Sequence, residues 1–249
     1  MVEPSGAWRI PGVERGFSAA LFDLDGVLTP TAALHQEAWR LLFQRWFESH
    51  GIVPPYTDDD YFEHVDGRPR YDAVRTVLAS RGVEIPEGSP DDEPGAQTVC
   101  GLGNLKDADF MEALRTRGIE AYAGSVALLD VLAALDVGSA VVSSSRNAIP
   151  VLEAAGLGGR FGAIVDGIVA EDEGLPGKPA PDTFLHAADL LHVPAADAVV
   201  VEDALSGVAA GRAGGFGLVV GVDRGAGARD LLDAGADLVV DDLALLVAP

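Results

Sequence analysis

Two aspartates that directly follow a short apolar segment are the residues of this sequence best suited to chemistry. Asp23 and Asp25 come after Ser18–Phe22, a run of small and apolar residues that predicts a buried strand. Because side chains alternate along an extended chain, both carboxylates are expected on the same side. Two carboxylates this close are hard to keep ionised unless a cation lies between them or one of them holds a proton. Mg²⁺, which prefers oxygen ligands, meets that need. Two solvated acids at the end of a strand are the alternative.

Other polar groups also follow predicted strands. The run Ser143-Ser-Ser-Arg-Asn147 comes after residues 138–142, and the pair Glu202-Asp203 comes after residues 198–201. In open α/β sheets, ligands bind beyond the carboxyl ends of the strands. The coincidence of three polar strand ends therefore predicts a site, although Ser143 taken singly is typical of a turn.

A positive charge and a helix start accompany these strand ends. Lys178 opens the segment Lys178-Pro-Ala-Pro-Asp182, which leads into a predicted helix. Serine hydroxyls, backbone N–H groups and the positive end of a helix dipole suit a phosphate. An ordinary solvated lysine is the competing interpretation of Lys178.

Predicted strands and helices alternate over most of the chain, and they must position the polar residues of the candidate site. Strands are predicted at residues 18–22, 138–142, 163–165, 198–201, 218–222 and 238–240, and helices at 125–135, 148–155, 182–191 and 206–213. Such alternation is typical of βαβ units with right-handed crossovers. We therefore predict an α/β fold with a Rossmann-like, doubly wound parallel sheet for residues 1–32 and 119–249.

The remaining residues, 33–118, show helical patterns only and predict an inserted all-helical domain. Its helices are predicted at residues 32–49, 72–80 and 107–117, and the acidic, Pro- and Gly-rich residues 84–98 predict a loop that joins helices. Thr31, His35 and Trp39 recur every four residues, which places them on one stripe of the first helix. Core packing is the competing interpretation for the ring of Trp39, and an ordinary surface position for His35.

Composition limits the classes of partner. A formal net charge of −22 repels nucleic acid and anionic membranes, so we predict neither as a partner. A phosphate ester would need a local basic pocket. The single cysteine, Cys100, excludes an intramolecular disulfide and a cysteine zinc cluster. The first 17 residues lack the apolar core of a signal peptide, and no apolar run is long enough to span a membrane. We predict a cytoplasmic protein, and a monomer.

The order of four motifs resembles that of the haloacid dehalogenase-like phosphotransferases. The motifs are Asp23-Leu-Asp25-Gly-Val-Leu-Thr29, Ser143, Lys178-Pro-Ala-Pro-Asp182 and Glu202-Asp203-Ala-Leu-Ser-Gly207. The resemblance implies that the sheet is a core of that superfamily and that the helical insert is a C1-type cap. A true dehalogenase does not keep a second aspartate at the position of Asp25 and needs no metal.

Within this superfamily the sequence is most similar to the β-phosphoglucomutase family. The similar segments are Thr31-Ala-Ala-Leu-His35-Gln-Glu-Ala-Trp39, Gly67-Arg-Pro-Arg70, Asn104-Leu-Lys106-Asp-Ala-Asp-Phe110 and Ser143-Ser-Ser145-Arg146-Asn147. Four positions depart from the family pattern. Pro30 stands where an acid is common, Asp107 where asparagine is usual, Arg146 where lysine is usual and Ala204 where serine is common.

The resemblance implies Mg²⁺-dependent phosphoryl transfer through an aspartyl phosphate. Asp23 would be the nucleophile, Asp25 the general acid and base, and Ser143 and Lys178 would hold the transferring phosphoryl group. The implied Mg²⁺ ligands are Asp23, Asp203, Glu202 and the backbone carbonyl of Asp25. The implied substrate-binding residues are Thr31, His35, Trp39, Gly67, Arg70, Lys106, Ser145, Arg146 and Asn147. Of these, Arg70, Ser145, Arg146 and Asn147 would bind a second phosphate.

The implied reaction interconverts β-D-glucose 1-phosphate and glucose 6-phosphate, primed by glucose 1,6-bisphosphate. A Mg²⁺-dependent sugar-phosphate phosphatase is the main alternative, because it needs only one phosphate site and a water molecule. A regulatory protein without turnover is disfavoured, since the four core motifs are complete. A phosphonoacetaldehyde-type hydrolase would need a cap lysine that forms an imine, and Lys106 lies in a segment that is similar to the mutase pattern instead.

Overall fold

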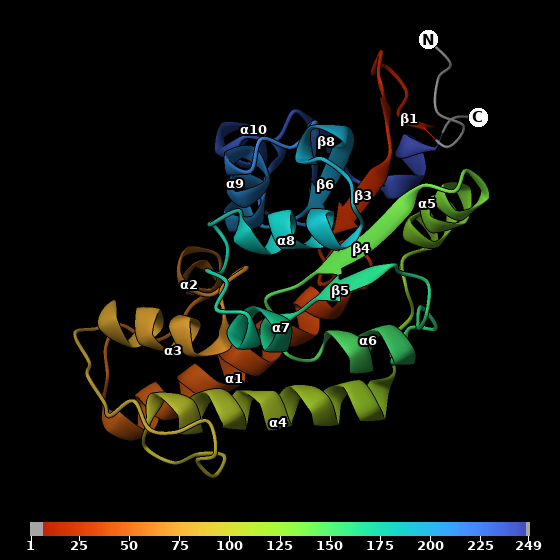
Figure 1. Ribbon diagram of the computed structural model, residues 1–249. Helices are drawn as coiled ribbons and strands as arrows, with labels where there is room; N and C mark the ends of the chain where they lie inside the picture. The colour runs from red at the N-terminus through yellow and green to blue at the C-terminus, as the bar shows by residue number, and fades with distance from the viewer. Residues whose placement is uncertain (1–6, 248–249) are drawn as a thin grey trace. The chain divides into compact units, whose positions relative to one another are not determined.

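The computed structural model describes residues 7–247, and the chain forms two compact units (Figure 1). The core unit comprises the described residues of ranges 1–30 and 120–249, and the helical unit comprises residues 31–119. These boundaries lie within two residues of the predicted ones. The ends of the predicted core, residues 1–6 and 248–249, lie outside the described residues.

A six-stranded parallel sheet forms the centre of the core unit, as predicted. Its order is β5-β4-β3-β6-β7-β8, and every neighbouring pair is parallel. The strands are β3 (Ala19–Phe22), β4 (Gly138–Val142), β5 (Ala163–Val165), β6 (Ala198–Glu202), β7 (Leu218–Val222) and β8 (Leu238–Val240). The strand that precedes the first aspartate is therefore central, with β4 on one side and β6 on the other.

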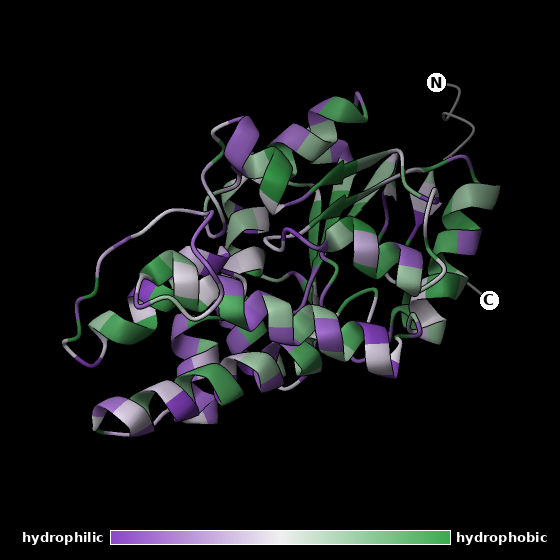
Figure 2. Ribbon diagram, turned by 90° about the horizontal axis from the view of Figure 1, so that it is seen from below, coloured by the Kyte–Doolittle hydropathy of each residue, from purple (hydrophilic) through white to green (hydrophobic). Residues whose placement is uncertain are grey.

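Helices cover both faces of this sheet. Leu21 and Phe22 point to opposite faces, and both are fully buried. On one face, Phe184 packs in a cluster with Leu21 and Ala140. The strands are correspondingly hydrophobic in Figure 2, which is typical of a parallel sheet buried on both sides. The helices are α5 (Ala123–Ala134), α6 (Ala148–Ala154), α7 (Gly167–Asp172), α8 (Asp182–Leu190), α9 (Leu205–Ala213) and α10 (Ala228–Ala234), with short 3₁₀ turns η1 (Ala195–Asp197) and η2 (Leu243–Leu246).

The helical unit contains α1 (Thr31–His50), α2 (Asp58–His64), α3 (Arg70–Ala79) and α4 (Val99–Arg117). Its apolar core is rich in aromatic side chains, and Trp39 belongs to it, stacked on Phe43 with ring centroids 5.6 Å apart. The packing interpretation of the Trp39 ring is therefore confirmed.

The predicted start of α4 near residue 107 is wrong, because the helix begins at Val99. Gly101 and Gly103 weaken the helical pattern in the sequence, yet both lie inside the helix. A Cβ at Gly101 would lie 2.4 Å from the carbonyl oxygen of Ala96, and one at Gly103 2.8 Å from the ring of Tyr71. Glycine is needed at both positions because neighbouring segments pack against the helix.

Other short elements carry little periodicity and were not predicted. These are α2, α7, α10 and a hairpin of β1 (Trp8–Arg9) and β2 (Gly16–Phe17). The predicted loop at residues 84–98 contains no helix or strand, and Asn104 of α4 donates hydrogen bonds to its Pro90 and Asp92 carbonyls. Among the residues that the structure describes, no helix combines the length and apolarity needed to cross a membrane.

Candidate active site

The polar strand ends meet at one edge of the core sheet. Asp23 follows β3, Ser143 follows β4 and Glu202 ends β6, so three adjacent parallel strands bring them to the same edge. The backbone N–H of Asp23 donates to the carbonyl oxygen of Val201 at 2.9 Å, which fixes the aspartate beside the end of β6. The sheet topology therefore creates the cluster that the sequence predicted.

Lys178 bridges two of these acids. Its Nζ donates to Asp23 Oδ1 at 2.6 Å, to Glu202 Oε1 at 2.5 Å and to the Val142 carbonyl at 3.0 Å. An ammonium group has three protons, and all three are used. The side chain is only 2% exposed, which excludes the interpretation of Lys178 as a solvated lysine.

Glu202 is held on both carboxylate oxygens. Oε1 accepts from Lys178, while Oε2 accepts from the backbone N–H groups of Asp203 and Ala204, each at 3.1 Å. Gly207, in the first turns of α9, leaves room for this carboxylate. A Cβ at Gly207 would lie 1.8 Å from Glu202 Oε1. The glycine of this motif therefore has a steric role that the sequence interpretation did not assign.

We expect Gly207→Ala to displace Glu202 and to lower the free energy of unfolding by about 1–3 kcal/mol, the cost of disturbing a buried hydrogen-bonded group. Urea denaturation at neutral pH measures this change. Gly158→Ala is the matched control, because the nearest atom to its Cβ would be 3.8 Å away, an ordinary contact. Equal stability of the two variants would contradict the steric role of Gly207.

Negative charge exceeds positive charge in this cluster. Burial raises the pKa of Asp23 well above its usual value, with the charges of Glu202 and Asp25 adding to the effect and Lys178 opposing it. Burial also disfavours the charged form of Lys178, but the carboxylates of Asp23 and Glu202 outweigh it and raise the pKa of the lysine. One ammonium therefore does not balance the buried carboxylates.

A divalent cation would neutralise the excess negative charge of these carboxylates. Ligand oxygens of Asp23, Glu202 and Asp203 lie within 4.8 Å of one another. Carboxylate oxygens in this arrangement are the donors that Mg²⁺ prefers. Gly26 shapes the same place, because it has φ +91° and its Cβ would lie 1.8 Å from Asp203 Oδ2. The structure thus brings three of the four predicted metal ligands into one group, and Asp25 is close enough for its charge to act on Asp23.

The serine loop after β4 is held by its own hydroxyls. Ser143 is buried, and its Oγ accepts from the backbone N–H of Ser145 at 3.1 Å. The Oγ of Ser145 accepts in turn from the N–H of Asn147 at 3.1 Å. Arg146 forms an ion pair with Glu171 of α7. The loop therefore contains the hydroxyl and guanidinium groups that were predicted to bind a phosphate. In this structure the guanidinium of Arg146 is paired with the carboxylate of Glu171.

In the helical unit, Lys106 and His35 are in contact. The Lys106 ammonium hydrogen-bonds His35 Nδ1, and it lies 4.8 Å from the ring centroid of Phe110 and 5.2 Å from that of Trp39. The His35 ring stacks on Phe110 with centroids 3.9 Å apart. The structure therefore places three predicted substrate-binding residues, Lys106, His35 and Trp39, in one group.

Arg70, predicted to bind a phosphate, begins α3 and forms an ion pair with Asp107 of α4 at 2.6 Å. The Arg70 side chain is 14% exposed. Gly67 lies in the turn before α3 with φ +70°, and Thr31 is the buried first residue of α1. Asp107 is one of the four residues that depart from the family pattern, and its carboxylate pairs with Arg70, a contact that the sequence interpretation missed.

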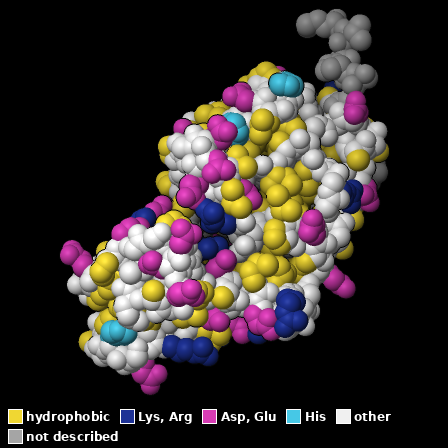
Figure 3. All heavy atoms as spheres, turned by 60° about the horizontal axis from the view of Figure 1, so that its bottom comes forward, with side chains coloured by type: hydrophobic (Ala, Val, Ile, Leu, Met, Phe, Trp, Pro, Cys, Tyr) yellow, Lys and Arg dark blue, Asp and Glu magenta, His cyan; other side chains and the backbone are white. Residues whose placement is uncertain are grey.

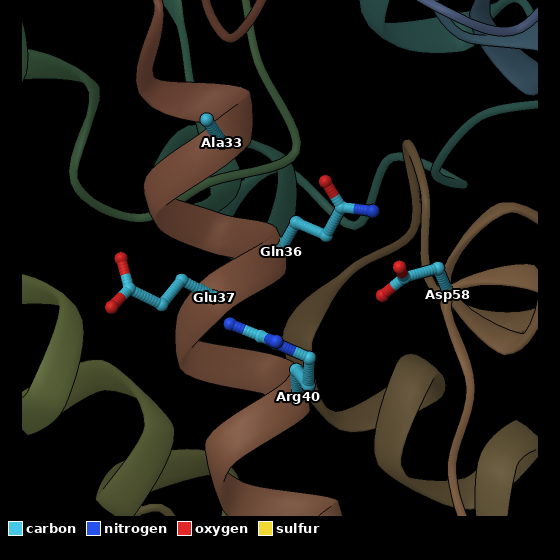
Figure 4. Close-up of a pocket in the computed structure, with 5 residues that line it drawn as sticks. All are labelled: Ala33, Gln36, Glu37, Arg40 and Asp58. Carbon is cyan, nitrogen blue, oxygen red and sulfur yellow. The ribbon is translucent and has the colours of Figure 1, made fainter.

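A cavity of about 350 Å³ lies elsewhere on the helical unit (Figure 4). Its lining consists of Ala33, Gln36, Glu37, Arg40 and Asp58. Gln36 and Asp58 point toward one another across it (Figure 4). Helical periodicity places the α1 lining residues opposite the stripe of Thr31, His35 and Trp39. The cavity is therefore separate from the predicted substrate-binding stripe.

The surface has the acidic character that the composition predicts. Acidic side chains are scattered over the face that Figure 3 shows. A phosphate ligand therefore depends on local cations, and Lys178, Arg146, Arg70 and Lys106 are those that the candidate groups contain.

Comparisons with known proteins agree with this geometry. The family model of haloacid dehalogenase-like hydrolases matches residues 17–215. A β-phosphoglucomutase from Mycobacterium tuberculosis (strain CDC 1551 / Oshkosh) is 47% identical, covering 96% of this chain and 95% of the relative. Hexitol phosphatase A from Escherichia coli (strain K12) is 30% identical, covering 78% of each chain. The crystal structure of a β-phosphoglucomutase from Clostridium difficile has a TM-score of 0.74 at 25% identity, covering 93% of each chain.

Proposed function

Because this chain belongs to the haloacid dehalogenase-like hydrolase family, we propose that it is a Mg²⁺-dependent β-phosphoglucomutase that acts through an aspartyl phosphate. The predicted family and the predicted class, an enzyme of phosphoryl transfer, are confirmed by the matches. The proposed reaction is the interconversion of β-D-glucose 1-phosphate and glucose 6-phosphate, with glucose 1,6-bisphosphate as the priming intermediate. The observation that carries the proposal is Lys178 bridging Asp23 and Glu202 beside Asp203.

Asp23 is the nucleophile of this proposal. One of its carboxylate oxygens attacks one phosphorus of glucose 1,6-bisphosphate, the bond from that phosphorus to the sugar oxygen breaks, and Asp25 gives a proton to that oxygen, so a sugar monophosphate leaves. The 6-hydroxyl of β-D-glucose 1-phosphate then attacks the aspartyl phosphate and loses its proton to Asp25, which frees Asp23 and forms glucose 1,6-bisphosphate again. Lys178 and Ser143 hold the phosphoryl oxygens, where charge spreads in the transition state.

Asp23, Glu202, Asp203 and the backbone carbonyl of Asp25 would hold Mg²⁺. When bound, the ion neutralises the repulsion between a carboxylate nucleophile and a phosphoryl group. The charge excess around Asp23 supports this assignment.

A second phosphate site separates a mutase from a phosphatase. A bisphosphate must be held at its non-reacting end while the first phosphoryl group transfers. We assign this role to Arg70, Ser145, Arg146 and Asn147, and the handling of the sugar to Thr31, His35, Trp39, Gly67 and Lys106. Both arginines are held by carboxylates, Asp107 and Glu171. A dianionic phosphate can compete with these carboxylates for the two guanidinium groups, because it forms strong charge-assisted hydrogen bonds to arginine.

Phosphorus NMR tests the proposal. The protein is mixed with Mg²⁺, β-D-glucose 1-phosphate and a trace of glucose 1,6-bisphosphate. We expect glucose 6-phosphate to accumulate without inorganic phosphate. Accumulation of inorganic phosphate would instead support the second candidate, a sugar-phosphate phosphatase, which the 30% identity to hexitol phosphatase A favours. The cytoplasmic location and the monomer stay predictions.

We expect Arg70→Ala to reduce kcat/KM for the sugar phosphate by about 10- to 100-fold, because one charge-assisted hydrogen bond contributes roughly 1.5–3 kcal/mol. Hydrolysis of a small aryl phosphate, which has no second phosphate, should change by less than about threefold on the same reasoning. Steady-state kinetics with both substrates measures the difference. Arg75→Ala is the control, since Arg75 is also on α3 but pairs with Asp72 and Glu87 at the surface. Equal losses with both substrates would contradict the distal role of Arg70.

A further inference from the structure

Arg224 lies near the candidate active site, although none of the four motifs contains it. It follows β7, the strand next to β6, and therefore comes to the same edge of the sheet as Glu202. Its Nε donates to the Gly26 carbonyl at 2.8 Å, and its Nη1 donates to the Asp241 carbonyl at 2.8 Å. The guanidinium carbon lies 4.0 Å from the ring centroid of Tyr122. One side chain thus joins three segments of the core unit.

The contact with Gly26 bears on the acid cluster. Gly26 directly follows Asp25, and its backbone packs so closely on Asp203 that a Cβ would overlap that carboxylate. The N–H of Gly26 donates to the Thr29 carbonyl at 2.8 Å, so with Arg224 on its carbonyl both backbone polar groups of Gly26 are hydrogen-bonded. The backbone of Gly26 is therefore fixed on both sides, between Asp25 in the chain and the carboxylate of Asp203 in space.

The charge of Arg224 also acts close to Asp203. Burial raises the pKa of Tyr122, while Arg224 lowers it and Asp203 raises it, so both charges lie near the same phenol. The ring of Tyr122 in turn keeps the guanidinium in place by a cation–π contact.

We propose that Arg224 is a positioning residue for the metal site, which fixes the Asp23–Gly26 loop against Asp203. The side chain acts through the Gly26 carbonyl and needs no contact with substrate. Its planar fork reaches two carbonyls at once, which a lysine does not reproduce. This inference rests on the Mg²⁺ site of the proposed function, and not on the identity of the sugar.

Mn²⁺ binding tests the role of Arg224 without any substrate. Electron paramagnetic resonance of free Mn²⁺ gives the dissociation constant for the unchanged protein and for Arg224→Met. We expect about a tenfold weaker affinity in the variant, which corresponds to roughly 1.4 kcal/mol. Arg229→Gln on α10 is the control, because that arginine pairs with Asp233 and is 87% exposed. It should bind Mn²⁺ like the unchanged protein.

A merely structural role would lower the unfolding temperature of the metal-free protein and leave the Mn²⁺ affinity of the folded protein unchanged. That result with Arg224→Met would overturn the proposal. If Arg224→Met does not fold, Arg224→Lys replaces it, with an expected loss of about threefold since the charge stays but the fork is lost; unchanged affinity would overturn the proposal equally. Absence of Mn²⁺ binding by the unchanged protein would contradict the metal site itself, and with it this inference.

Discussion

Replacement of Asp23 by asparagine is expected to abolish phosphoryl transfer while the protein stays folded. The amide lacks the charge of a carboxylate nucleophile and cannot form the aspartyl phosphate. We expect kcat to fall by about 10⁴-fold or more, the range seen when a covalent nucleophile is removed. The phosphorus NMR assay measures the loss. Asp233→Asn, an exposed aspartate on α10, is the control and should retain full activity.

The same variant separates the chemical role of Asp23 from a structural one. Burial raises the pKa of Asp23 in the folded protein. The folded state therefore binds more protons than the unfolded state between the ordinary pKa and the raised one, and stability falls as the pH rises through that interval. Asparagine carries no charge, and Lys178 keeps Glu202 and the Val142 carbonyl as partners.

We therefore expect metal-free Asp23→Asn to unfold at a temperature no lower than the unchanged protein at neutral pH. The difference should shrink as the pH falls, since Asp23 itself then becomes protonated. Added Mg²⁺ should stabilise the unchanged protein more than the variant. Near-normal turnover by Asp23→Asn would contradict the covalent mechanism, and a large loss of stability would show that Asp23 is chiefly structural.

The sequence predicts the core unit well because its signals are local. Each strand is a short apolar run, and the groups of the site follow these runs directly, as Asp23 and Glu202 do. Parallel topology then brings the strand ends together. The helix boundaries inside the helical unit are harder to predict. Gly101 and Gly103 hide the start of α4, because their role depends on Ala96 and Tyr71, which no local pattern reveals.

The partners of the charged residues could not be predicted from local spacing. Lys178 is 24 residues from Glu202 and 155 from Asp23 in the chain, yet it contacts both. Asp107 was recognised as a departure from the family pattern, but its ion pair with Arg70 joins two helices. Such contacts depend on the tertiary fold, and the sequence contains only the residue types that make them possible.

Lys178→Met is expected to impair both stability and activity. The chain has two lysines, Lys106 and Lys178, and both are buried. Methionine preserves the shape of the Lys178 stem but leaves the carboxylates of Asp23 and Glu202 facing one another. Removal of one partner from a buried ion pair costs about 3–5 kcal/mol. We expect a loss of that size in urea denaturation at neutral pH without metal, and a loss in kcat of about 10³-fold or more, since roughly 4 kcal/mol of transition-state stabilisation disappears.

The pH dependence of the stability of Lys178→Met shows whether the loss comes from repulsion between Asp23 and Glu202. The carboxylates of Asp23 and Glu202 raise the pKa of Lys178 above its ordinary value, so the lysine contributes its full stabilisation at every pH below that ordinary value. In the variant, Asp23 and Glu202 repel each other, and protonation of one relieves the repulsion. The variant should therefore regain stability as the pH falls toward 5, while the unchanged protein does not gain to the same extent.

Lys106→Met provides the comparison. The Lys106 ammonium contacts the His35 imidazole and lies close to the rings of Trp39 and Phe110, against which a methionine packs readily. We expect a smaller loss of stability in this variant and no comparable recovery in acid. If both variants lose the same stability with the same pH dependence, the loss comes from burial of the lysine stem. The pairing of Lys178 with Asp23 and Glu202 would then not be its cause. A Lys178→Met protein that is unstable only at neutral pH would instead tie stability and the proposed catalytic role to one charge, because the same ammonium donates hydrogen bonds to both buried carboxylates, Asp23 and Glu202.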